Sequence, residues 1–90
     1  MTILENAIAS TSHTLARDRG HLTAKLAVAI TCTRQPDPDR AANLGLRALH
    51  TARDTGSARI MHELHTLGAQ LNDRWPTHSA SRSFHDALAA

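Results

Sequence analysis

The stretch of residues 36–59, PDPDRAANLGLRALHTARDTGSAR, sets an Ala- and Leu-rich run between two groups of helix-terminating residues. Asp37 can cap a helix whose first turn accepts Pro38, because the N–H group that proline lacks has no intrahelical partner there. Gly56 suits the left-handed conformation that ends many helices, and Ser57 can cap the next one. The stretch therefore predicts a helix with a short turn on each side, as in a helical hairpin.

Apolar residues recur three and four positions apart through the rest of the chain, which is typical of one face of a helix. We expect helices over residues 3–10, 13–34, 38–54, 57–72 and 79–89. The polar run STSHT separates the first two, with Ser12 as a new N-cap. Gly20 lies inside the second helix, and a break there is the alternative, because an interior glycine costs roughly 1 kcal/mol relative to alanine.

Each longer helix has at least one face that should turn toward the core. For the second helix this face consists of Leu15, Arg19, Leu22, Leu26, Ala29 and Thr33. The third helix has two apolar faces, so it should lie between neighbouring helices. These faces are formed by Ala41, Leu44, Gly45 and Ala48, and by Ala42, Leu46 and Leu49. The last two helices present Ile60, Leu64, Leu67 and Leu71, and Ala80, Phe84, Ala87 and Leu88.

Composition favours a helical class of fold. Aromatic residues make up 2% of the chain and there is no tyrosine, so the core must be built from aliphatic side chains with high helix propensity. No segment shows the alternation of β-branched residues that a strand needs. Since helices joined by short turns pack as antiparallel neighbours, we expect an all-α antiparallel array of four to five helices arranged in helical hairpins.

Charge and cysteine content argue against several classes of function. The formal net charge is +2, and the basic residues are spread along the chain rather than clustered as in a nucleic-acid-binding face. The single cysteine, Cys32, excludes an internal disulfide and a zinc site built from several cysteines. There is no secretory signal and no apolar run that could span a bilayer, so we expect a cytoplasmic protein without membrane contact.

No arrangement of residues in the sequence predicts catalysis. Ser and Thr gather where helix caps and turns need them, and capping and the helix dipole explain Asp37 and Asp39. There is no glycine-rich phosphate loop and no pair of carboxylates on a common face. We therefore expect a protein that is not an enzyme and carries no cofactor.

Seven histidines leave metal binding open as an alternative. His62 and His65 stand one turn apart in the sequence HELH and could share a metal ion. A third ligand would have to come from elsewhere, with His50, His78 and His85 as the candidates. The metalloprotease helix differs, because its second histidine lies four residues after the first. A solvated helix face explains the same two histidines without a metal.

Three residues are candidates for contact with a partner. Arg40 and Arg47 stand two turns apart on the third helix, where their guanidinium groups could bind an acidic peptide or a carboxylate. A solvated face, paired with Asp39 and Asp54, is their other explanation. Trp75, in the loop before the last helix, could anchor a partner or seal the end of the core.

One part of the chain resembles the 34-residue tetratricopeptide repeat. Ala29, Ala41 and Ala48 match small-residue positions of its two helices, with the family's spacing of 12 and then 7 residues. The chain departs from the family at Cys32 and Gly45, where the repeat usually carries aromatic residues. The resemblance implies tetratricopeptide-like helical hairpins.

A narrower resemblance extends over about three quarters of the chain, from Arg17 onward. The segments RDRGHLTAKLA, DPDRAANLGLRALHTARDTGSARI and SFHDALAA are similar to the C-terminal tetratricopeptide-like regions of actinomycete helix-turn-helix regulators of the Cro/repressor type. The resemblance implies a sensor or dimerisation region that binds a protein or peptide, with a second copy of the chain as one candidate partner. Nothing before Arg17 could supply a helix-turn-helix reader. We therefore expect a sensor region cut from a longer regulator, or a stand-alone relative, without specific DNA binding of its own.

Overall fold

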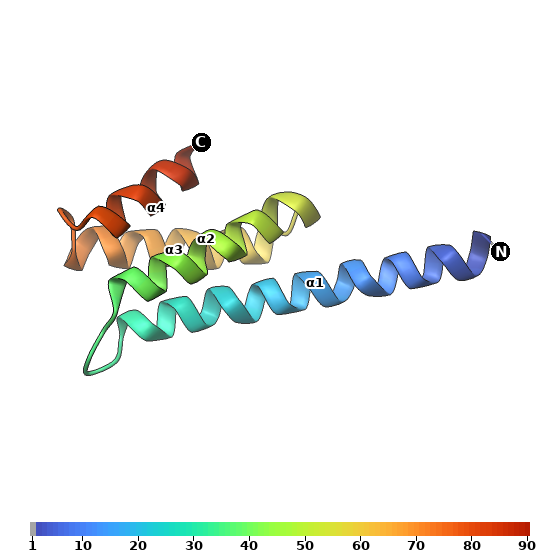
Figure 1. The fold of residues 1–90 in the computed structure, drawn as a ribbon, viewed down its shortest axis with the longest axis horizontal. Helices are drawn as coiled ribbons and strands as arrows, with labels where there is room; N and C mark the ends of the chain where they lie inside the picture. Colours follow the sequence, from blue (N-terminus) through green and yellow to red (C-terminus); the bar gives the residue numbers. More distant parts are fainter. Residues whose placement is uncertain (1) are drawn as a thin grey trace.

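The computed structural model describes residues 2–90, with side chains from Thr14 onward. It contains four helices, α1 (Thr2–Thr31), α2 (Pro38–Thr55), α3 (Ala58–Arg74) and α4 (Ser79–Ala89). No strand occurs in these residues, so the predicted all-α class is confirmed. Successive helices reverse direction along the long axis of the molecule (Figure 1).

α1 is one continuous helix, so the prediction of two helices at the start of the chain is wrong. The break predicted at residues 10–14 does not form, because Ser and Thr cost only about 0.5 kcal/mol relative to alanine inside a helix. Their hydroxyls can also bond to the carbonyl one turn earlier, as Thr23 Oγ1 does with the Arg19 carbonyl at 2.8 Å. α1 ends at Thr31, and its last turn is closed by the Cys32 N–H, which donates to the Ala29 carbonyl at 3.0 Å.

Gly20 lies within α1 because the helix crosses two neighbours at this residue. A Cβ atom there would lie 2.8 Å from Ile60 Cδ1 of α3 and 2.8 Å from Thr51 Cγ2 of α2. Glycine therefore permits an approach at which a Cβ atom would force these side chains to shift, and this close packing offsets its low helix propensity.

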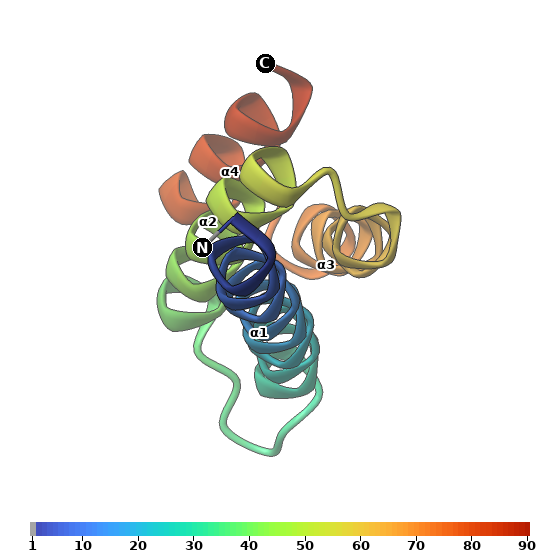
Figure 2. The same ribbon diagram turned by 90° about the vertical axis from the view of Figure 1, so that its right-hand side faces the viewer.

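α2 and α3 form the centre of the molecule. They contact each other, and both contact α1 and α4. Within the described chain, α1 and α4 do not contact each other. Figure 2 shows α1 and α4 on different sides of this central pair. The molecule measures 53 × 28 × 16 Å, since the N-terminal half of α1 extends beyond the other helices (Figure 1).

The predicted core faces of α3 and α4 are confirmed. The residues of α3, which are at most 1% exposed, are Ile60, Leu64, Leu67 and Leu71. In α4, Phe84 is fully buried. Around it, Ala80, Ala87 and Leu88 are partly buried against the core. α2 is buried on both predicted faces except at Leu44, which is partly buried, and at Leu46, which is 36% exposed.

α1 packs through the face opposite to the predicted one. Its buried residues are Gly20, Ala24, Ala27, Ile30 and Thr31. The leucines that the sequence predicts inside, Leu15, Leu22 and Leu26, are 52%, 67% and 46% exposed. Arg19, Ala29 and Thr33 of the same predicted face are also exposed. The small residues face inward because they let α1 approach both α2 and α3, and close contact with two helices packs more atoms than a leucine ridge would allow.

The predicted helix boundaries around α2 are set by the expected caps. Asp37 Oδ1 accepts the Arg40 N–H at 3.0 Å at the start of α2. Gly56 follows α2 with a φ of 68°, and its N–H donates to the Ala52 carbonyl at 2.8 Å. Ser57 Oγ accepts an N–H bond of 3.2 Å from the first turn of α3.

Replacing Asp37 with alanine should lower the free energy of unfolding by about 1 kcal/mol, because the first turn of α2 loses its side-chain acceptor. Urea denaturation followed by circular dichroism would measure the change. Asp54→Ala is the matched control, since Asp54 is exposed near the other end of α2, where no amide needs a cap. Equal losses in the two variants would contradict the capping role.

Candidate functional site

A groove between α1 and α2 combines positive charge with apolar surface. It has a volume of about 560 Å³. Its lining residues are Arg19, Gly20 and Thr23 of α1 and Leu46, Arg47, Ala48, His50 and Thr51 of α2. Gly20, one of the lining residues, lets α1 approach Thr51 of α2 closely.

The charge in this groove is uncompensated. Arg19 and Arg47 are exposed, and no carboxylate in the described part of the chain pairs with either of them. Asp39, which the sequence offers as a partner for the arginines of α2, instead accepts a hydrogen bond from His78 Nε2 at 2.9 Å. Two guanidinium groups with free donors, beside the exposed edge of Leu46, suit a ligand that carries carboxylates and some apolar surface.

The structure brings only one of the predicted partner-binding residues into the groove. Arg47 lines it, whereas Arg40 lies two turns earlier on α2 and is exposed outside it. The sequence pattern places Arg19 on the core face of its helix, so sequence reasoning misses it as a site residue. The same pattern offers His50 only as a metal ligand. Arg19 and His50 are recognisable as groove residues only if the buried face of α1 is known, and that face depends on tertiary packing.

Trp75 closes the end of the core. Its backbone N–H donates to the Leu71 carbonyl at 2.8 Å, and its side chain is half-buried against the core. The guanidinium carbon of Arg74 lies 4.7 Å from the ring centre. Arg74 also donates a hydrogen bond to the Thr31 carbonyl at the end of α1. These contacts favour the sealing role over the role of an exposed anchor, and none of them joins Trp75 to Arg40 or Arg47.

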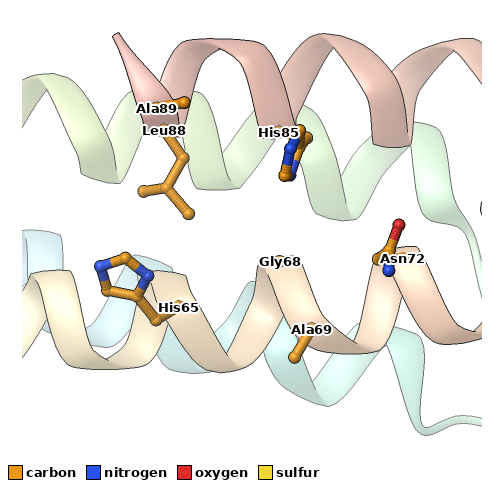
Figure 3. Close-up of a pocket in the computed structure, with 7 residues that line it drawn as sticks. All are labelled: His65, Gly68, Ala69, Asn72, His85, Leu88 and Ala89. Carbon is orange, nitrogen blue, oxygen red and sulfur yellow. The ribbon is translucent and has the colours of Figure 1, made fainter.

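The two histidines of the predicted metal pair face different surroundings. His65 lines a cleft of about 300 Å³ between α3 and α4, with His85 on the opposite helix (Figure 3). The other lining residues are Gly68, Ala69, Asn72, Leu88 and Ala89. His62 is exposed outside this cleft. Among the residues with described side chains, no three histidines, cysteines or carboxylates gather as a metal site.

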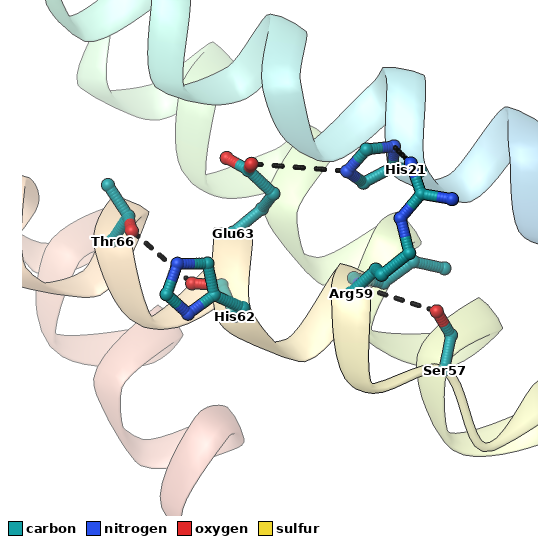
Figure 4. Close-up of polar contacts among 7 residues, drawn as sticks. His21, Ser57, Arg59, His62, Glu63 and Thr66 are labelled. Atoms are coloured by element: carbon teal, nitrogen blue, oxygen red, sulfur yellow. Dashed lines mark hydrogen bonds and ion pairs between the residues drawn. The ribbon is translucent and has the colours of Figure 1, made fainter.

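Polar contacts join α1 to the start of α3 (Figure 4). His21 Nε2 lies 3.9 Å from Glu63 Oε1, and His21 Nδ1 lies 3.4 Å from Arg59 Nη2. Thr66 Oγ1 donates to the His62 carbonyl at 3.3 Å, within α3 itself. In this cluster His21 of α1 is the histidine with partners on a neighbouring helix, Arg59 and Glu63 of α3.

The described helices include none with the combination of length and apolar character that crossing a membrane requires. A comparison with protein-family models found no matching family, and comparisons with curated proteins and with solved structures found no match.

Proposed function

We propose that this chain is a non-catalytic helical interaction module with tetratricopeptide-like hairpins, whose α1–α2 groove binds an acidic segment of a protein or peptide partner. The observation that carries the proposal is the pair of uncompensated guanidinium groups, Arg19 and Arg47, at a largely apolar groove. In this role the chain resembles the sensor region of a bacterial transcription regulator, acting without DNA contact of its own.

The pattern of helix contacts supports the hairpin architecture. Two stacked hairpins bring first helix against first helix and second helix against second helix, while the two outermost helices remain apart. Here α1 contacts α3, α2 contacts α4, and α1 and α4 share no contact in the described chain. Ala41 and Ala48 are buried, as the small positions of the repeat require. Ala29 is exposed, and the alanine of α1 that is buried in the core is Ala27 instead.

The chemistry of the groove supports an acidic partner. A guanidinium group presents parallel N–H donors that match both oxygens of a carboxylate. Thr23, His50 and Thr51 add further polar groups, and Leu46 offers apolar surface to a residue between two acids. Because both arginines are exposed, their attraction for a partner should be modest and sensitive to salt.

The test is binding of a short labelled peptide of alternating Glu and Leu, measured by fluorescence anisotropy, against the same peptide with Lys in place of Glu. We expect saturable binding of the acidic peptide alone, weakening as salt is added. Arg47→Glu should weaken it at least about tenfold, since one attraction becomes a repulsion. Arg82→Glu makes the same charge change on α4, outside the groove, and should leave binding nearly unchanged. Equal binding of both peptides, or equal effects of the two variants, would contradict the proposal.

A further inference from the structure

α1 carries a second apolar face that no part of the described chain covers. Leu15, Leu22 and Leu26 are about half exposed or more, at 52%, 67% and 46%. They lie on the side of the helix opposite to Ala24 and Ala27, which are fully buried against the rest of the molecule. We call this set, with the exposed Ala29, the α1 stripe. Among the described helices α1 contacts α2 and α3, and its buried residues mark the side that meets them, so the α1 stripe faces solvent.

Charged residues border the α1 stripe on the side toward α3. Asp18 lines a small cleft with His21 and Arg59, which marks this border. Lys25 follows Asp18 by seven residues, or about two turns, and therefore lies on the same border. Neither residue forms an ion pair within the described chain. Asp18 and Lys25 thus lie on the same edge of the α1 stripe, Asp18 about one turn before Leu22 and Lys25 about one turn after it.

We propose that a second copy of this chain docks on the α1 stripe, with the two α1 helices antiparallel about a two-fold axis near Leu22. The antiparallel arrangement sets the two copies of Leu22 against each other and Leu15 of each copy against Ala29 of the other, so that a large side chain meets a small one. It also brings Asp18 of each copy to the level of Lys25 of the other, which forms two ion pairs by symmetry.

The same features identify the occupant as a second copy. A two-fold interface requires a patch that complements its own image, and one acid and one base placed symmetrically about an apolar centre meet that requirement. Three exposed leucines on one side of a single helix are typical of an interaction surface. The inference rests on the proposed function as an interaction module, and adds a partner and its register.

Sedimentation equilibrium of the full chain, from micromolar to millimolar concentration, tests the dimer. We expect a concentration-dependent rise from the monomer mass of 9.7 kDa to twice that value. Leu22→Asp should raise the dissociation constant at least about a hundredfold, because symmetry applies the substitution twice at the centre of the interface. Ala69→Asp, which places the same charge on an exposed residue of α3, should dimerise like the unmodified chain. Leu22 is exposed, so circular dichroism should show both variants folded.

Charge exchange tests the register. Asp18→Lys alone and Lys25→Asp alone should each weaken the dimer, because each places like charges opposite one another. The variant with both substitutions should regain most of the affinity, since every pair is again of opposite sign. A dimer indifferent to Leu22→Asp, or single substitutions that leave the affinity unchanged, would overturn the proposal.

The two proposals fail separately. A chain that remains monomeric at millimolar concentration but binds the acidic peptide would overturn the self-docking inference and leave the groove in place. A chain that dimerises through Leu22 but binds neither peptide would overturn the groove alone.

Discussion

Replacing Phe84 with alanine should lower the free energy of unfolding by about 3–5 kcal/mol, the range typical of a buried phenylalanine. Phe84 is fully buried and is the single phenylalanine in the chain. Its ring lies against two glycines, since a Cβ atom would be 2.7 Å from Cε1 if built at Gly45 and 3.6 Å from Cε2 if built at Gly68. The variant would therefore leave a cavity. Glycine backbone borders this cavity on two sides, where no side chain can move in to fill it.

Chemical denaturation, with hydrogen exchange read separately for each helix, would measure this effect. Small domains have a total stability of about 5–15 kcal/mol, so the loss is a large part of the whole. We expect the amides of α4 to lose protection first, because Phe84 is the largest fully buried side chain that α4 contributes. Leu46→Ala is the control, since it removes a partly exposed apolar side chain and should cost under about 1 kcal/mol. Similar losses in the two variants would contradict the central place of Phe84.

Replacing Gly45 with valine should destabilise the protein by about 3 kcal/mol, at the upper end of overpacking effects. The first added carbon alone would stand 2.5 Å from Leu67 Cδ2 and 2.7 Å from Phe84 Cε1. Both of those side chains are fully buried, so they have no room to move aside. Gly45→Ala should cause a smaller loss in the same direction, although alanine is the better helix former.

Gly68 provides the control for the valine variant. A Cβ atom there would lie 3.4 Å from Leu88 Cδ2 and 3.6 Å from Phe84 Cε2, which is ordinary packing distance. Gly68→Ala should therefore raise the melting temperature, because the gain in helix propensity of about 0.5–1 kcal/mol meets no clash. If Gly68→Ala lowered the stability as much as Gly45→Ala does, the difference in clearance between the two glycines would not explain their effects, and the prediction would be wrong.

The extent to which the sequence predicts the fold differs between the two halves of the chain. For α2, α3 and α4, the caps at Asp37 and Ser57 and the stripe from Ile60 to Leu71 predict both the boundaries and the buried faces. These signals are local, since a cap depends on hydrogen bonds within one turn and a single apolar face leaves one way to pack. For α1, the same reasoning predicts a break that does not form and a buried face that is exposed.

The candidate groove shows how an error in one helix conceals a site. Arg47 is recognisable from α2 alone, but Arg19 and Arg47 face one groove only once α1 packs through Gly20, Ala24 and Ala27. With the leucine face inward, Arg19 would lie in the core and the groove would not exist. Because Arg19 belongs to α1 and Arg47 to α2, only the packing of these two helices brings them to the same groove.

The amino-acid sequence by itself determined the helical class, the turns that separate α2 from its neighbours, and the inward faces of α3 and α4, because each depends on interactions within a few residues. Only the tertiary structure decided which side of α1 is buried. This helix is apolar on two opposite sides, and hydrophobicity alone cannot choose between them. The small side chains decide which side is buried. They let the backbone of α1 come within contact distance of both α2 and α3, and the larger leucines would keep these helices further apart.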